Sequence, residues 1–152
     1  MNTISYFTLL LSFFTSVWSG PSTQTAGDPQ PAYGCTTNYD PALKLTVYTS
    51  VEKDPEYPGG APALGRFINR NLNEAALNPS IDCNVKIKMI IDSTGAIRKA
   101  VAIHGNEEVK EPNANEKEVL RVYQKSGTWE PGKCGGNNVT TEFVQSFTPC
   151  IK

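Results

Sequence analysis

Hydrophobic and polar residues alternate most regularly in the middle of the chain, between residues 83 and 104. Over residues 85–91 the odd positions are all apolar, and two of the even positions are lysines. This period of two is typical of a strand with one buried and one solvated face. Residues 92–95 (Asp-Ser-Thr-Gly) have the chemistry of a turn, and apolar residues alternate again over 97–103. The pattern predicts a β-hairpin whose apolar face needs cover from the rest of the chain.

Two further segments carry apolar residues at helical spacing, which predicts one amphipathic helix on each side of the hairpin. The first begins near Pro62, a residue suited to a first helical turn, and stops before Pro79. The second begins at Asn113, which with Glu116 forms a variant of the capping box, and ends at Gly127. The apolar stripes are Leu64, Phe67, Ile68 and Leu72 in the first helix and Val119, Leu120, Val122 and Tyr123 in the second.

A last strand is predicted over residues 139–147, and residues 43–51 could add a short strand in front of the first helix. The predicted fold is α+β, with two helices packed on one face of a small antiparallel three-stranded sheet. In this topology the strand 85–91 is central and the last strand is an edge with unpaired backbone groups. The candidate edge residues are Val139, Thr140, Thr141, Glu142, Phe143, Val144, Gln145, Ser146 and Phe147.

The chain has four cysteines and one histidine, and no two cysteines form a Cys-x-x-Cys pair. A zinc site is therefore a poor interpretation, and two disulfides in an oxidising compartment are expected. The topology puts Cys83 beside Cys150, whereas Cys134 lies at the opposite end of the sheet, roughly 23 Å away. Of the three possible connectivities, the sequence favours Cys83–Cys150 with Cys35–Cys134.

Residues 1–19 carry no charged side chain and are rich in Leu, Phe and Ile. They are interpreted as a secretory signal peptide, with an uncleaved membrane anchor as the alternative. Residues 20–42 read as a flexible tail, and residues 43–152 as the folded domain. The mature chain is then expected in an oxidising compartment outside the cytoplasm, or on a membrane if the first segment is retained.

The chemistry-bearing residues do not form a catalytic pattern. Fourteen basic residues balance fifteen acidic ones, which gives no sign of a nucleic-acid surface. His104 has no sequence partner that suggests a catalytic set, and the acidic residues around Glu107 lack a calcium-loop spacing. Trp129 is interpreted as a core or turn anchor. We therefore expect no enzyme activity, no cofactor and no metal.

Four motifs, in order and at matching spacing, resemble the C-terminal domains of TonB proteins, especially those of Bacteroidetes-type bacteria. They are residues 51–60 (Val-Glu-Lys-Asp-Pro-Glu-Tyr-Pro-Gly-Gly), 91–95 (Ile-Asp-Ser-Thr-Gly), 118–122 (Glu-Val-Leu-Arg-Val) and 129–133 (Trp-Glu-Pro-Gly-Lys). The resemblance covers about residues 47–148. It implies two helices on a three-stranded sheet, and a periplasmic module that binds the TonB box of outer-membrane receptors by strand addition, in support of energy-dependent transport. A homodimer through the edge strand is also possible.

The sequence departs from the family in three respects. No histidine precedes His104, the spacer would be residues 20–42, and Cys83 stands where the family usually has glycine. A free-standing, disulfide-braced binding module therefore fits better than a full energy transducer. The two other hypotheses are a minimal membrane-anchored transducer and a secreted structural or interaction domain that has kept the fold.

Overall fold

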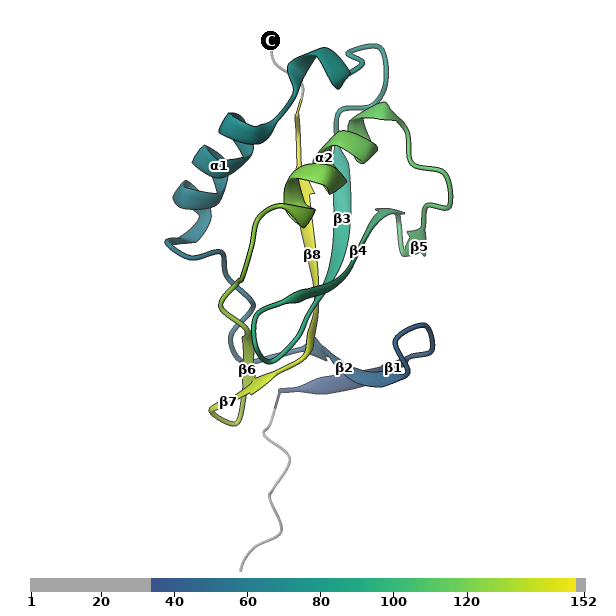
Figure 1. Cartoon of the computed structure of the whole chain (residues 1–152). Coiled ribbons are helices and arrows are strands. Elements are labelled where there is room, and N and C mark those ends of the chain that lie inside the picture. The colour runs from purple at the N-terminus through teal and green to yellow at the C-terminus, as the bar shows by residue number, and fades with distance from the viewer. Residues whose placement is uncertain (1–33, 150–152) are drawn as a thin grey trace, which may run out of the picture. The chain divides into compact units, whose positions relative to one another are not determined.

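The computed structural model describes residues 34–149 of the chain, which form two helices, a short 3-10 helix and eight strands (Figure 1). In chain order the elements are β1 (Thr36–Asp40), β2 (Leu45–Ser50), α1 (Gly60–Asn71), η1 (Glu74–Ala76), β3 (Val85–Ile91), β4 (Ile97–His104), β5 (Glu107–Glu108), α2 (Ala114–Gln124), β6 (Gly132–Cys134), β7 (Asn137–Val139) and β8 (Thr141–Phe147).

Six strands form one sheet in the order β1-β2-β8-β3-β4-β5, and β6 and β7 form a separate two-stranded sheet. The predicted three-stranded sheet with the last strand at its edge is therefore wrong. Its inner part, β8-β3-β4, has the expected antiparallel pairing. The prediction failed because Thr36–Asp40 and Glu107–Glu108 are polar and mostly exposed, so neither strand shows an alternating pattern that the sequence could reveal.

The predicted hairpin is confirmed as β3 and β4, which pair in antiparallel register. The Asp92 side chain accepts hydrogen bonds from the backbone N–H groups of Thr94 and Ala96, at 2.9 and 3.0 Å. Gly95 has φ +87°, and a Cβ atom there would lie 1.9 Å from the carbonyl oxygen of Trp129. The turn therefore needs glycine both for its backbone conformation and for the close approach of the later chain.

Both predicted helices are present. α1 buries Leu64 and Ile68, and η1 follows it as a separate short turn. α2 begins with the predicted capping box: the Asn113 side chain accepts from the Glu116 N–H at 3.0 Å, and the Glu116 carboxylate accepts from the Asn113 N–H at 2.8 Å. These two bonds satisfy N–H groups that would otherwise lack partners at the start of the helix.

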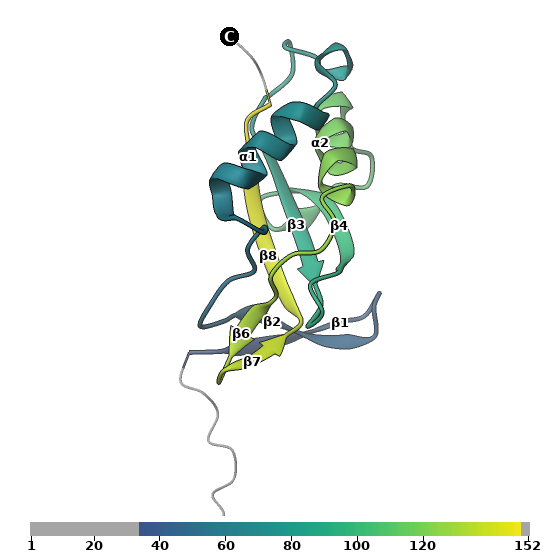
Figure 2. The ribbon, with the colours of Figure 1, turned by 60° about the vertical axis from the view of Figure 1, so that its left-hand side comes forward.

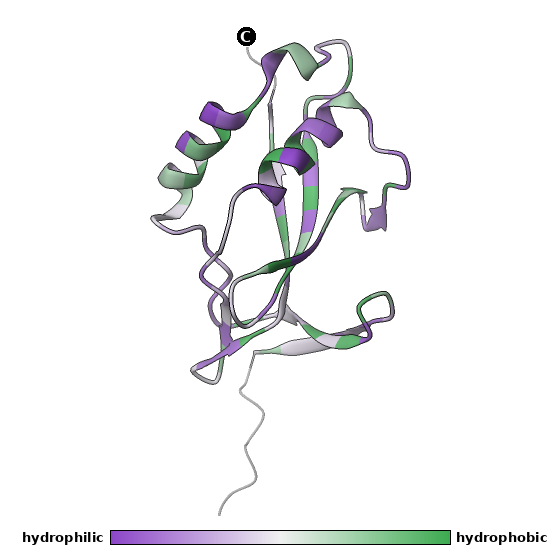
Figure 3. Ribbon diagram, in the orientation of Figure 1, coloured by the Kyte–Doolittle hydropathy of each residue, from purple (hydrophilic) through white to green (hydrophobic). Residues whose placement is uncertain are grey.

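The core lies between the two helices and one face of the sheet, and Figure 3 shows the apolar residues alternating with polar ones along β3. The side chains of Ile87 and Met89 are fully buried on this face, and Phe143 and Gln145 of β8 lie beside them in the ladder. Other buried members are Leu64, Ile68, Val85, Ile91, Ala102, Val119, Val122, Tyr123 and Trp129. Burial raises the pKa of Tyr123 to about 12.

The β1–β2 hairpin crosses the lower end of the sheet on the face away from the helices (Figure 2). Val47 of this hairpin is only 2% exposed. An ion pair between Asp40 and Lys99, 3.5 Å apart, joins the hairpin to β4. β1 lies within the segment 20–42 that the sequence assigns to a flexible tail, so from Thr36 onward this segment belongs to the folded sheet.

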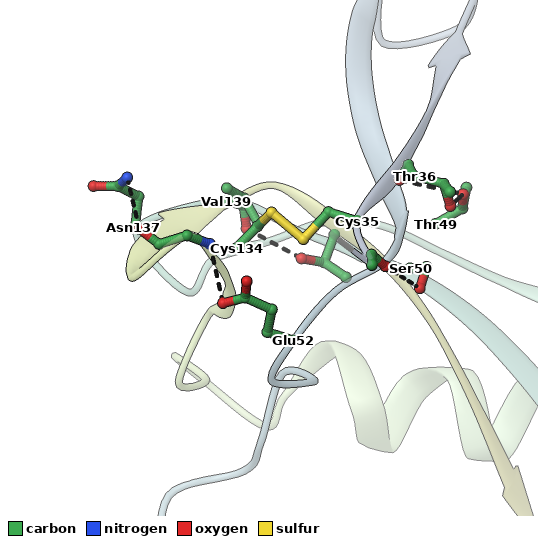
Figure 4. Close-up of a disulfide and its surroundings, with 11 residues drawn as sticks. Cys35, Thr36, Thr49, Ser50, Glu52, Cys134, Asn137 and Val139 are labelled. Carbon is green, nitrogen blue, oxygen red and sulfur yellow. Dashed lines mark hydrogen bonds between the residues drawn. A yellow bond between two sulfur atoms is a disulfide. The ribbon is translucent and has the colours of Figure 1, made fainter. Parts of the chain in front are cut away.

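The predicted Cys35–Cys134 disulfide is confirmed. It links the chain just before β1 to the end of β6 (Figure 4). The second predicted bond, Cys83–Cys150, involves Cys150, which lies outside the described residues, as does the predicted signal peptide. None of the helices within residues 34–149 is long and apolar enough to cross a membrane.

Candidate functional site

The predicted edge segment 139–147 is divided by the structure into three parts. Val139 ends β7 and pairs with Gly132 of the small sheet. Thr141 pairs with Tyr48 of β2, which lies parallel to β8. From Glu142 onward, no strand among the described residues pairs with the outer side of β8, and both ribbon views show β2 meeting β8 at its lower end alone (Figures 1 and 2). The free part of the edge is thus shorter than predicted, over residues 142–147.

The direction of the free backbone groups follows from the two ladders. The N–H of Tyr48 donates to the carbonyl of Thr140 at 2.8 Å, so the backbone groups of Thr140 face outward. Successive residues of a strand point their N–H and C=O groups to opposite sides. Val144 and Ser146 therefore present N–H and C=O groups on the outer side, away from β3. We call these groups the free rim of β8.

A pocket of about 170 Å³ lies beside the free rim, on the face of the sheet that the helices cover. It is formed by the loop before α1, the first turns of α1, the turn after α2, and β8. Its lining residues are Pro55, Glu56, Tyr57, Ala61, Leu64, Trp129, Phe143 and Gln145. We call it the rim pocket. Of these residues, sequence reasoning placed only Phe143 and Gln145 in a candidate site.

Aromatic rings in T-shaped and tilted contacts build the walls of the rim pocket. The rings of Tyr57 and Trp129 meet in a T-shaped contact with centroids 5.7 Å apart, and those of Trp129 and Phe143 are 6.2 Å apart. The indole N–H of Trp129 donates to the Ser126 hydroxyl at 2.8 Å, and the Trp129 backbone N–H donates to Gly95. These contacts fix the Trp129 ring, so the pocket is already formed without a partner.

Three charged side chains stand near the mouth of the rim pocket. Lys53 lies 3.2 Å from Glu130 and 4.0 Å from Glu56, and all three are about half exposed. Backbone bonds between Glu56 and Glu130 hold the two acidic residues together. One cation against two carboxylates leaves this mouth with a net negative charge, which disfavours an acidic group on an approaching partner.

A second, polar cleft of about 320 Å³ lies between the β1–β2 hairpin and the helix-free face of the sheet. Most of its charges are paired with one another: Glu108 accepts from both Lys88 and Lys99 at 2.8 Å. The bond from Lys88, with that from Lys99, lowers the pKa of Glu108. The bond to Glu108 raises the pKa of Lys99, and backbone N–H groups, that of Leu43 first, lower the pKa of Asp40. This network joins strands and pairs the charged residues that line the cleft, with the exception of Glu142.

Two other groups of reactive side chains lie elsewhere. The Glu52 carboxylate is close to the Cys35–Cys134 disulfide and accepts from the Gly135 N–H at 3.0 Å (Figure 4). With both sulfurs in the disulfide, this group lacks the thiolates that a metal requires. The Nε2 atom of His104 lies 2.6 Å from the Glu116 carboxylate that caps α2, so the histidine contacts a structural residue.

Comparison of the chain with models of protein families, with curated proteins and with solved structures gives no match. The resemblance to TonB C-terminal domains therefore depends on the quoted motifs alone. Two of these motifs, residues 51–60 and 129–133, supply Tyr57 and Trp129 to the walls of the rim pocket.

Proposed function

We propose that this domain is a binding module that captures an extended peptide by strand addition to the free rim of β8. The partner we propose is the TonB box of a TonB-dependent outer-membrane receptor, and the module would act in the periplasm in support of energy-dependent transport. The observation that carries the proposal is that, within residues 34–149, no strand pairs with the outer side of β8 beyond Thr141. The choice of partner is supported by the motifs that resemble TonB C-terminal domains.

The free rim offers enough hydrogen bonds for a weak, specific contact. Val144 and Ser146 each present one donor and one acceptor, and the Ser146 carbonyl also accepts a long, 3.5 Å hydrogen bond from the Gln145 side-chain amide. A net backbone hydrogen bond contributes about 1 kcal/mol. Four such bonds would contribute roughly 4 kcal/mol, before the cost of ordering the peptide. Side-chain contacts are therefore needed as well for micromolar binding, which requires about 8 kcal/mol.

Strand addition can be tested by removing one outward donor while keeping the ladder to β3. Ser146→Pro deletes the outward N–H of an exposed residue, and proline is tolerated at such a position of an edge. We expect a TonB-box peptide to bind about fivefold more weakly to this variant, since one hydrogen bond of about 1 kcal/mol is lost. Ser146→Ala, the matched control, keeps the N–H and should bind as the unmodified protein does.

Amide shifts of isotope-labelled protein locate the contact. We expect the largest shifts at Glu142–Phe147 when the peptide is added. The proposal fails if the peptide leaves these amides unchanged, an outcome that would favour a structural domain without this partner. Sedimentation of the free protein shows whether it is a monomer or a dimer. A dimer formed through the same edge of β8 would compete with the peptide.

A further inference from the structure

We infer that the rim pocket selects one apolar side chain of the added strand, so that the partner is recognised by a single branched aliphatic or aromatic residue in register with Phe143 or Gln145. This inference rests on the proposed function, since it assumes a strand along the free rim. It goes further by naming the residue of the partner that determines specificity and the place where that residue binds.

The register of β8 determines which partner residues can reach the pocket. Phe143 and Gln145 share the face of the sheet with the buried residues Met89 and Ile87, under the helices. Val144, which is 46% exposed, lies on the opposite face. Because side chains alternate along a strand, every second residue of an added strand points to the pocket side. The partner residues opposite Phe143 and Gln145 therefore lie on the pocket side of the sheet, and the residue between them lies on the same side as Val144.

The size and chemistry of the rim pocket match one apolar group. Its volume of about 170 Å³ is close to that of an apolar cavity of roughly 150 Å³ that accepts a benzene ring. The walls are the rings of Tyr57, Trp129 and Phe143 with the side chain of Leu64. A charged group would lose its hydration here without a buried partner, and an acidic one would also meet Glu56 at the mouth.

Ala61 offers a way to fill the pocket without touching the free rim. It is an exposed residue in the first turn of α1 and lines the pocket. Ala61→Trp should occupy the space meant for the partner side chain, and Ala61→Leu is a smaller variant that fills part of it. Asn69→Trp is the matched control, because Asn69 is an exposed residue of the same helix outside the pocket.

The experiment measures binding of a TonB-box peptide and of versions in which each position in turn is replaced by serine. With the unmodified protein and with Asn69→Trp, we expect one position to dominate, its replacement weakening binding roughly 10- to 100-fold, as expected for burying one apolar side chain. With Ala61→Trp the same position should lose its effect. Nuclear Overhauser contacts should join that side chain to the rings of Tyr57 and Trp129.

The outcomes separate this inference from the proposed function. If the peptide shifts the amides of Glu142–Phe147 but no position dominates, or Ala61→Trp and Asn69→Trp bind it equally well, the pocket does not select a side chain and strand addition stands. If no peptide shifts these amides, strand addition itself is wrong, and the inference falls with it.

Discussion

The disulfide between Cys35 and Cys134 should contribute a large share of the stability of the domain. The two residues are 99 positions apart in the sequence, and the chain-entropy treatment gives about 4.7 kcal/mol for closing a loop of roughly 100 residues. The native state reduces this value. Among the described strands β1 pairs only with β2, and its residues are mostly exposed. Breaking the disulfide therefore also frees part of the folded chain. We expect the double variant Cys35→Ala, Cys134→Ala to lose about 2–4 kcal/mol.

Urea denaturation followed by far-UV circular dichroism measures the loss of stability. Hydrogen exchange shows which parts of the fold are destabilised. Exchange should accelerate most in β1 and β2, while β3 keeps the protection of the core. Ser50→Ala is the control: it removes the 2.9 Å hydrogen bond from the Ser50 hydroxyl to the Gly34 carbonyl nearby and should cost about 1 kcal/mol or less. If the double variant loses no more free energy of unfolding than this control, the reasoning is refuted, because the disulfide would then not restrict the unfolded chain.

Two further predictions concern backbone strain and acid stability. Gly95→Ala should destabilise the domain by roughly 2 kcal/mol or more, since its Cβ would meet the Trp129 carbonyl. Gly105→Ala, the control, is at φ +63° in open space and should cost about 1 kcal/mol. Equal thermal midpoints of the two variants would contradict this prediction. The hydrogen bond from Arg121 lowers the pKa of Glu118 below its ordinary value of 4.5. The ionised Glu118 carboxylate therefore stabilises the fold above pH 4.5, and this stabilisation is lost as the pH falls through the pKa of the folded state. Glu118→Gln should therefore flatten the decline of the melting temperature in acid; an unchanged slope would count against the pair.

The parts of the fold that could be predicted are those with local signals. The β3–β4 hairpin combines alternation with turn chemistry that needs Gly95, and α2 carries its own capping residues, Asn113 and Glu116. The disulfide between Cys35 and Cys134 also followed, because the antiparallel order of β3 and β8 was enough to separate the ends of the sheet. The hairpin and the helix cap depend on residues close in sequence, and the disulfide depends on the pairing of β3 with β8.

The parts that could not be predicted depend on contacts between distant segments. β1 consists of exposed polar residues, Thr36–Asp40, and is held by its pairing with β2 and by the disulfide, neither of which a periodic pattern reveals. The break at Thr140 between β7 and β8 also escaped prediction, because residues 139–147 read as one strand. The rim pocket combines Tyr57, Leu64 and Trp129 from three separate segments, and only folding brings them together.

The same long-range contacts determine how much of β8 stays open. β2 reaches β8 at Thr141 and continues no further along it, because the hairpin turns across the helix-free face, where Asp40 pairs with Lys99. A hairpin that ran straight on beside β8 would occupy the free rim and close the mouth of the rim pocket. The elements that overturn the predicted three-stranded sheet are therefore also those that confine the candidate site to the stretch beyond Thr141, next to the pocket.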